Sequence, residues 1–279
     1  MIETEVGADD GRRLHVYDSV GGPAPRVVYW LHGSGMSGLP PTPLLDAADA
    51  LGVRVVAHDR PGYGASGARP GRSVADGAAD VVTVLDALGI ASAGVLGLSA
   101  GGMHALAAAA LAPERVLAAA VLGCPAPFGA VGLDWFAGMS EANRAEFDAA
   151  LRGADALRAH LGTAELDPSV FAPEDLAAMH GPFWEWQLAA AGADTTEGVI
   201  EDELASLSDW GFRLDSISAP TLLVHGTGDT FVPVSHARWL AAELPASTLR
   251  TEPGGHISTI PFSSDAMTWL ASRTAAANP

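Results

Sequence analysis

The sequence predicts an α/β protein in which helices cover both faces of a mostly parallel β-sheet. Short apolar runs alternate along the chain with longer stretches rich in alanine and leucine, as strands do when crossover helices connect them. The chain has 279 residues, of which 48% are hydrophobic, so it can bury one sizeable core. We expect a single α/β domain, or such a domain with an insertion.

Eight runs are the candidate strands. The first two flank Asp10 and Gly11, a residue pair that favours a hairpin turn. The next four are short and apolar, as buried strands of a parallel sheet are, and two more follow where the alternation of strands and helices resumes late in the chain. In chain order the eight runs are residues 4–6, 13–17, 26–31, 53–57, 93–98, 118–122, 221–224 and 247–250.

Helices are expected between these strands. One begins at Ser73, a candidate N-cap, and ends near Leu88, just before Gly89. A second covers residues 100–111 and stops before a proline. The same pattern predicts a helix over residues 235–244, after the seventh predicted strand, and another over residues 265–272, after the eighth.

The pattern changes between residues 125 and 211. Helical stretches follow one another there without a convincing strand. Four of the seven tryptophans fall in this part, namely Trp135, Trp184, Trp186 and Trp210. We interpret it as a helical insertion, which divides the chain into a first core part (1–124), the insertion (125–211) and a second core part (212–279).

The acidic composition argues against several classes of partner. With 33 acidic and 15 basic side chains the net charge is −18, and such a surface repels nucleic-acid phosphates and anionic lipids. No stretch reaches the roughly 18 apolar residues of a membrane span, and the start of the chain lacks the pattern of a secretory leader. Cys124 is the only cysteine, so no intramolecular disulfide can form. We expect a cytoplasmic protein that binds a small molecule; the oligomeric state stays open.

Residues 97–102 are the most informative about function. A predicted strand ends here, Ser99 follows, and a predicted helix begins, which fits the G-x-S-x-G nucleophile elbow. The turn is so tight that the residues two before and two after the serine must be very small, and both are glycine. The Ser99 hydroxyl would point out above the sheet, while the helix N-terminus and the Ala100 N–H would face a developing oxyanion.

A second glycine-rich turn, His-Gly-Ser-Gly at residues 32–35, follows the third predicted strand. Acyl transfer needs two N–H donors aimed at one oxygen. This turn would let the main-chain N–H of Ser34 reach the same point as that of Ala100, so the predicted oxyanion hole consists of Ser34 and Ala100. A plain glycine turn is the alternative.

Residues 59–66 read Asp-Arg-Pro-Gly-Tyr-Gly-Ala-Ser after the fourth predicted strand. With this D-x-P-G-x-G-x-S loop lying between the turn at 32–35 and the elbow at 97–102, the chain resembles the α/β-hydrolase family. The resemblance implies a mostly parallel eight-stranded sheet with flanking helices and an inserted helical lid that roofs Ser99. It also implies that Asp59 and Arg60 shape the turn beside the site rather than act in catalysis.

The resemblance also places the acid and the base, because the family's order is nucleophile, acid, histidine. Residues 225–233 match the family's H-G-x-x-D…V-P loop at Asp229, and His256 follows Pro-Gly-Gly in the base position. His256 would take the proton of Ser99, and Asp229 would hold the imidazole, giving an acyl-enzyme that water then hydrolyses. We expect no cofactor and no metal, since the other histidines lack metal-binding spacing.

The predicted lid carries candidate substrate contacts. Trp135, Phe136, Trp184 and Trp186 are expected to line an apolar pocket, with burial of the lid's own face as the alternative. The acidic residues of the lid are Glu185, Glu201, Asp202 and Glu203. Proline-iminopeptidase-like relatives use lid carboxylates to hold a free amine, but a solvated face is the favoured interpretation in so acidic a protein. The elbow also departs from the G-G-S-W-G form of those peptidases.

A serine at the nucleophile position disfavours dehalogenase and epoxide-hydrolase chemistry, in which a carboxylate attacks. We therefore predict a serine hydrolase with an acyl-enzyme mechanism, most simply a carboxylic-ester hydrolase of small, largely apolar substrates. The alternatives on the same machinery are a C–C bond hydrolase, a proline iminopeptidase-like enzyme and a perhydrolase or haloperoxidase-like enzyme. A non-catalytic small-molecule receptor on the same fold is the alternative from another class.

Overall fold

The predicted strands form one sheet of eight in the computed structural model, which describes the chain except for residues 23, 165–166, 192–195 and 275–279. The strand order is β1-β2-β4-β3-β5-β6-β7-β8. β2 pairs antiparallel with β1 and β4, and every other neighbouring pair is parallel, so the mostly parallel sheet is confirmed. The strands are β1 (Ile2–Gly7), β2 (Arg13–Asp18), β3 (Val27–Leu31), β4 (Arg54–His58), β5 (Ala93–Leu98), β6 (Val116–Leu122), β7 (Thr221–Gly226) and β8 (Ser247–Glu252).

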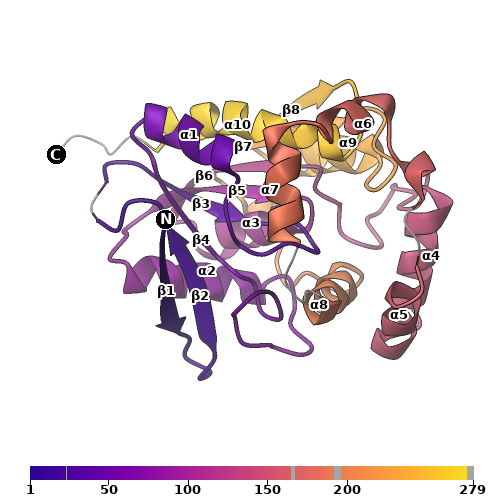
Figure 1. Cartoon of the computed structure of the whole chain (residues 1–279), viewed down its shortest axis with the longest axis horizontal. Helices are drawn as coiled ribbons and strands as arrows, with labels where there is room; N and C mark the ends of the chain where they lie inside the picture. Colours follow the sequence, from indigo (N-terminus) through magenta and orange to yellow (C-terminus); the bar gives the residue numbers. More distant parts are fainter. Residues whose placement is uncertain (23, 165–166, 192–195, 275–279) are drawn as a thin grey trace.

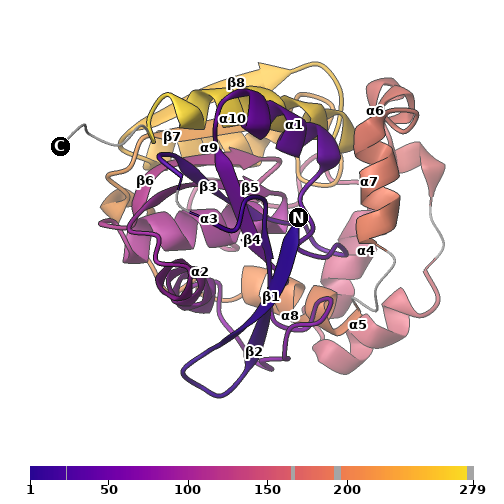
Figure 2. The same ribbon diagram turned by 60° about the vertical axis from the view of Figure 1, so that its left-hand side comes forward.

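Helices cover both faces of this sheet, as Figure 1 and Figure 2 show. The core on one face is built with α2 (Asp76–Ala87), α3 (Ala100–Leu111) and α9 (Val234–Glu243). The core on the other face is built with α1 (Thr42–Ala50) and α10 (Ser263–Ala271). The sequence pattern did not predict α1, which is short and begins with a proline in its first turn.

The central strands are apolar along their whole length because both of their faces are covered. Every residue of β3, β4 and β5 is buried, which is the pattern expected of parallel strands between two helical layers. β8, at the sheet edge, has no fully buried residue. The carboxyl ends of β3, β5 and β7 therefore come to one edge of a rigid sheet, and the loops that follow them meet there.

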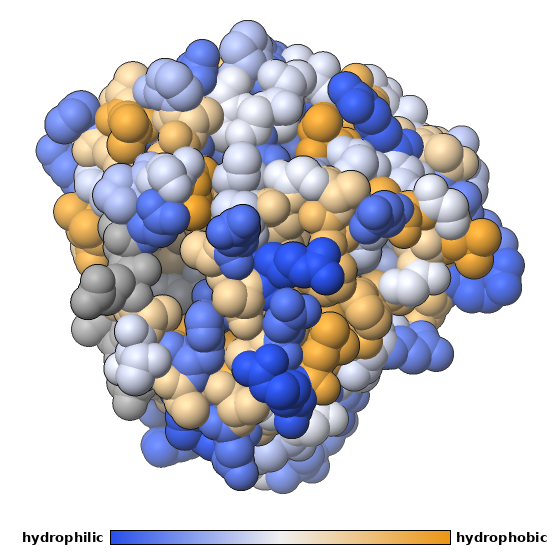
Figure 3. Space-filling model, turned by 90° about the vertical axis from the view of Figure 1, so that its right-hand side faces the viewer, coloured by the Kyte–Doolittle hydropathy of each residue, from blue (hydrophilic) through white to orange (hydrophobic). Residues whose placement is uncertain are grey.

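The chain between β6 and β7 is helical and contains no strand in its described residues. It holds α4 (Glu141–Ala150), α5 (Ala154–Leu161), α6 (Pro173–Ala178), α7 (Pro182–Ala190) and α8 (Thr196–Ser206), called the helical segment below. Its helices α4, α5 and α6 lie on the right-hand side of Figure 1, and hydrophilic and hydrophobic residues are interspersed over that side of the molecule (Figure 3). Among the described helices, none has the length and apolarity needed to cross a membrane. The division at residues 124 and 211 stays a prediction.

Helix α2 begins later than its predicted N-cap. Ser73 does act as a cap, because its N–H and hydroxyl bond to the Asp76 carboxylate at 2.8 and 2.9 Å, and its hydroxyl accepts from the Asp76 N–H at 3.3 Å. The regular helix starts only at Asp76. The Ala75 N–H donates to the carbonyl of Trp210, so a contact distant in sequence holds the intervening turn.

Candidate active site

Ser99 lies in a strained turn between β5 and α3. Its φ of 52° and ψ of −124° place it in a region that only glycine adopts readily, and it is the single described non-glycine residue with a positive φ. A Cβ at Gly97 would collide with the carbonyl of Gly101, and a Cβ at Gly101 would collide with that of Leu31. The two glycines thus let strand, turn and helix approach closely enough to present the Ser99 side chain.

The glycine-rich turn after β3 lies directly beside Ser99. A Cβ at Gly33 would be 3.5 Å from the Cβ of Ser99, and Ser34 follows it. Ser34 and Ala100 both line the same cavity as Ser99. Ala100 is the first residue of α3, so its N–H belongs to the first turn, where no helical acceptor is available. The structure therefore brings both predicted oxyanion donors to the serine.

Arg60 is hydrogen bonded to the glycine-rich turn at residues 32–35. Its guanidinium donates to the carbonyls of His32 and Gly33, and its own N–H donates to His32 Nε2 at 3.1 Å. Burial and the positive charge of Arg60 keep the pKa of His32 well below its usual range, so His32 is neutral with its proton on Nδ1, bonded to the Gly33 carbonyl at 2.8 Å. The motif after β4 thus fixes the glycine-rich turn at residues 32–35 through Arg60.

Asp229, in the loop after β7, is fully satisfied. One carboxylate oxygen accepts the N–H groups of Phe231 and Val232, each at 2.9 Å, and the other lies 2.7 Å from Nδ1 of His256 and 3.4 Å from Nε2 of His225. Burial opposes its ionisation, but the charge of His256 and the hydrogen bonds from His225 and His256 outweigh burial and lower the pKa of Asp229. Asp229 is therefore a fixed anion behind His256.

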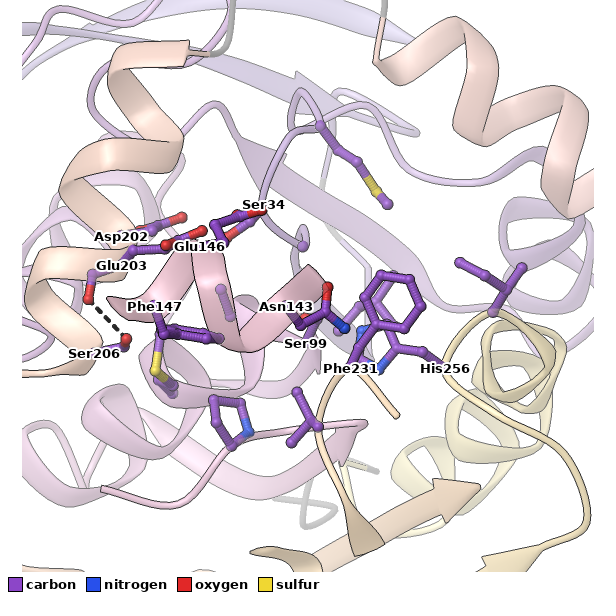
Figure 4. Close-up of a pocket in the computed structure, with 18 of the residues that line it drawn as sticks. Ser34, Ser99, Asn143, Glu146, Phe147, Asp202, Glu203, Ser206, Phe231 and His256 are labelled. Carbon is purple, nitrogen blue, oxygen red and sulfur yellow. Dashed lines mark hydrogen bonds between the residues drawn. The ribbon is translucent and has the colours of Figure 1, made fainter. Parts of the chain in front are cut away.

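His256 follows β8 and lines the cavity together with Ser99 (Figure 4). Gly123, at the end of β6, makes room for it, since a Cβ there would lie 2.9 Å from Cε1 of the imidazole. The Phe231 ring stacks on the imidazole with a centroid separation of 5.4 Å. Burial disfavours the imidazolium, yet the Asp229 carboxylate overcomes this and raises the pKa of His256. With Nδ1 bonded to Asp229, Nε2 is the nitrogen left for proton transfer.

The cavity has a volume of ≈ 220 Å³ and two different ends. In Figure 4, Phe231 and His256 lie at one end, which we call the histidine end. Glu146, Asp202 and Glu203 lie together at the other end, which we call the acidic end. Ser99 lies between the two, and the acidic end is built wholly from α4 and α8 of the helical segment.

The four aromatic residues predicted to bind substrate are not among the cavity-lining residues. Trp135 is buried against Phe147 and His236, and its indole N–H donates to the Ala126 carbonyl. Trp186 is buried and donates to the Leu39 carbonyl. Trp184 packs on the core beside α1, and Phe136 packs on Trp135. This corrects the prediction, because each aromatic buries a face of the helical segment; the lining includes Phe147, Gln187 and Ile260 instead.

Asp202 and Glu203 are buried, although the sequence favoured a solvated acidic face. Asp202 is bonded to the Arg60 guanidinium and the Tyr63 hydroxyl, both at 2.6 Å, and it also contacts Arg72 and His104. Arg60 and Arg72 lower the pKa of Asp202 well below its usual range against the effect of burial. The helical spacing of small residues around position 202, at Gly198, Ala205 and Ser206, is the sequence signal for this buried face.

Asp175 of α6 was also missed. It is buried, accepts the main-chain N–H of Ser258 at 2.7 Å and lies where a Cβ on Gly255 would be. It therefore fixes the loop that carries His256. Among the described residues, no three histidine, cysteine or acidic side chains gather as a metal site would require.

The comparisons with known proteins agree with this fold. The family model described as "alpha/beta hydrolase fold" matches residues 26–261, and the chain belongs to that family. It is 28% identical to a 2-hydroxy-6-oxononadienedioate/2-hydroxy-6-oxononatrienedioate hydrolase of Burkholderia vietnamiensis, over 86% of this chain and 84% of the relative. A non-heme chloroperoxidase of Streptomyces lividans is 29% identical over 75% and 78% of the two chains.

The fold is also similar to that of a solved esterase from Exiguobacterium antarcticum, with a TM-score of 0.71 over 98% of this chain and 99% of that one, at 22% identity. These relatives carry out different reactions on one architecture. The family match and the hydrolase relatives support an enzyme of the α/β-hydrolase class, and its particular reaction is a matter for the site.

Proposed function

We propose that the protein is a serine hydrolase that cleaves carboxylic esters of small, largely apolar acids through an acyl-enzyme on Ser99. One observation carries the proposal. His256, bonded at 2.7 Å to the buried Asp229, lines the same cavity as Ser99, which a strained turn holds at the start of α3. Nucleophile, base and orienting acid in this arrangement are the parts that acyl transfer requires.

In the proposed reaction, Nε2 of His256 takes the proton of Ser99 as its oxygen attacks the ester carbonyl. The N–H groups of Ser34 and Ala100 stabilise the oxyanion. His256 then gives the proton to the departing alkoxide, which leaves as an alcohol. Water loses a proton to His256, attacks the acyl-enzyme and releases the acid, while Asp229 stabilises the imidazolium in both halves of the reaction.

The helical segment acts in this proposal as the lid that sets substrate shape. Asn143, Phe147, Gln187 and Ser206 come from it and line the cavity. The remaining walls beside Ser99 are mostly apolar, with Met36, Leu98, Met103, Ile257 and Ile260 among them. A short apolar acyl chain therefore fits beside the serine.

Hydrolysis of a C–C bond is the second candidate, because the relative from Burkholderia vietnamiensis is named for that substrate class and aligns over most of both chains. The same serine and histidine would serve either reaction. Ester hydrolysis and C–C bond hydrolysis can be separated by comparing the turnover of p-nitrophenyl butyrate with that of a 2-hydroxy-6-oxo-dienoate. Faster turnover of the ester supports the proposal, and turnover of the dienoate alone would replace it.

Covalent labelling tests the nucleophile. A fluorophosphonate probe is expected to label the wild type once per chain and to leave Ser99→Ala unlabelled. Ser272→Ala, which changes an exposed serine after α10, is the matched control and should label like the wild type. A wild type that neither labels nor turns over any ester would leave the receptor alternative and sink the proposed hydrolase.

A further inference from the structure

Two carboxyl groups at the acidic end of the cavity have no part in the hydrolysis described above. Glu203 of α8 and Glu146 of α4 both line the cavity, and Figure 4 shows them beside each other. Glu203 is only 8% exposed, and its Oε2 has no hydrogen-bond partner among the described residues. In Figure 4 both residues lie near Ser34, on the side of Ser99 away from His256.

The neighbouring residue shows what a structural carboxylate looks like in this protein. Asp202 is held by Arg60, Arg72, Tyr63 and His104, and these partners neutralise it. Glu203, one residue along the same helix, has no cationic partner in the described structure. Leaving a buried oxygen without a hydrogen bond destabilises a protein, and a ligand that donates to Glu203 would remove this cost.

The ionisation of Glu203 indicates how the acidic end of the cavity responds to a charged ligand. Burial, the contact with the Glu146 carboxyl group and the nearby Asp202 carboxylate raise the pKa of Glu203 well above its usual range. A further anion placed beside these carboxyl groups would be repelled by them. No arginine or lysine is among the cavity-lining residues, so a carboxylate placed here would meet repulsion without a counter-ion.

We propose that Glu146 and Glu203 form a subsite for a substrate group that donates hydrogen bonds, such as a hydroxyl, an amide N–H or an ammonium, and that this subsite rejects a carboxylate. The inference deepens the proposed function by naming the far end of its substrate. It also separates this chain from the relative whose printed name describes a dioate, because a dioate carries a second carboxylate.

Equilibrium binding tests the subsite apart from catalysis. Four non-hydrolysable amides of equal chain length are titrated into Ser99→Ala by calorimetry: hexanamide, 6-hydroxyhexanamide, 6-aminohexanamide and adipamate, the monoamide of adipic acid. We expect the hydroxyl compound, the amino compound or both to bind about tenfold more tightly than hexanamide, and adipamate about tenfold less tightly. The hydroxyl and amino arms distinguish plain hydrogen bonding from attraction of a cation.

The double variant Glu146→Gln/Glu203→Gln, made in the Ser99→Ala background, removes both ionisable carboxyl groups but keeps shape and hydrogen-bonding capacity. It should bind adipamate about as well as hexanamide, because an amide N–H can donate to a carboxylate. Glu141→Gln/Glu243→Gln in the same background removes two exposed carboxyl groups and should keep the original preference. This control separates the local effect from the change in net charge.

Two results would overturn the subsite: adipamate binding to the parent as tightly as 6-hydroxyhexanamide and 6-aminohexanamide, or a preference that is unchanged in Glu146→Gln/Glu203→Gln. Neither result depends on turnover, because Ser99→Ala is used throughout. The failure of the hydrolase would show instead as absent probe labelling and absent ester turnover of the wild type, so the two proposals fail separately.

Discussion

At the histidine end of the cavity, the Asp229 carboxylate accepts two main-chain N–H groups and lies against two histidines. At the acidic end, Glu203 is also buried, but one of its carboxyl oxygens has no hydrogen-bond partner among the described residues. The same functional group thus has its pKa lowered at one end and raised at the other. Burial alone does not determine a carboxyl group's state; the donors around it do.

The largest expected effect comes from replacing the carboxylate of Asp229, whose oxygens are fully hydrogen bonded. In Asp229→Asn, an amide would face Nδ1 of His256 and favour the wrong tautomer of the imidazole. We expect kcat/KM for p-nitrophenyl butyrate to fall by about 10⁴-fold with little change in the melting temperature. Steady-state kinetics and circular dichroism measure the two quantities. A variant that keeps a tenth of the activity would show that Asp229 does not orient His256.

A smaller effect, on stability, is expected when Asp202, the hydrogen-bonded carboxylate of the acidic end, is replaced. Asp202→Asn leaves Arg60 and Arg72 buried without their counter-ion, and breaking a buried pair in this way costs about 3–5 kcal/mol. Urea unfolding measures the loss. Asp209→Asn, at an exposed position three residues after α8, is the control. Equal unfolding midpoints for the two variants would mean that the buried cluster adds no stability.

The smallest effect concerns the unsatisfied carboxyl group and depends on pH. The pKa of Glu203 is raised in the folded protein, so above about pH 4.5 the unfolded chain ionises it and the folded chain does not. Wild-type stability is therefore lost as pH rises through this window, whereas an amide cannot ionise. Relative to the wild type, the free energy of unfolding of Glu203→Gln should therefore rise by at most about 1.4 kcal/mol for each pH unit.

Urea unfolding at a series of pH values above 4.5 measures this difference. Glu243→Gln, at an exposed site on α9, should run parallel to the wild type. A difference between Glu203→Gln and the wild type that stays constant with pH would contradict a raised pKa at Glu203.

The sequence predicted the features that depend on short-range patterns. Apolar runs located the strands, and the glycines around Ser99 predicted the elbow because their close contacts follow from the turn itself. Asp229 and His256 came from motifs whose order is tied to the sheet. Ser99, Asp229 and His256 each follow a strand, and the sheet fixes where the residues after a strand lie.

The features that escaped prediction depend on how distant elements pack. Arg60 and Asp202 are 142 positions apart, and no local pattern reports such a contact. Whether a tryptophan on a helix faces the cavity or the core depends on the rotation of that helix, which composition does not specify, so Trp135 and Trp186 were placed in the wrong environment. The sequence analysis named Glu203 but favoured a solvated face for it, because its neighbours on α4 are far away in sequence and its burial could not be predicted.

The bridge from Asp202 through Arg60 to the carbonyls of His32 and Gly33 also limits how this enzyme can be re-engineered. Exchanging the residues between β6 and β7 for those of a relative is a common way to import a new substrate range. Here such a graft would remove the anion that Arg60 and Arg72 share, next to the turn at residues 32–35. The two parts of the chain therefore depend on each other, and we expect a chimera that keeps an acid at position 202 to preserve this turn.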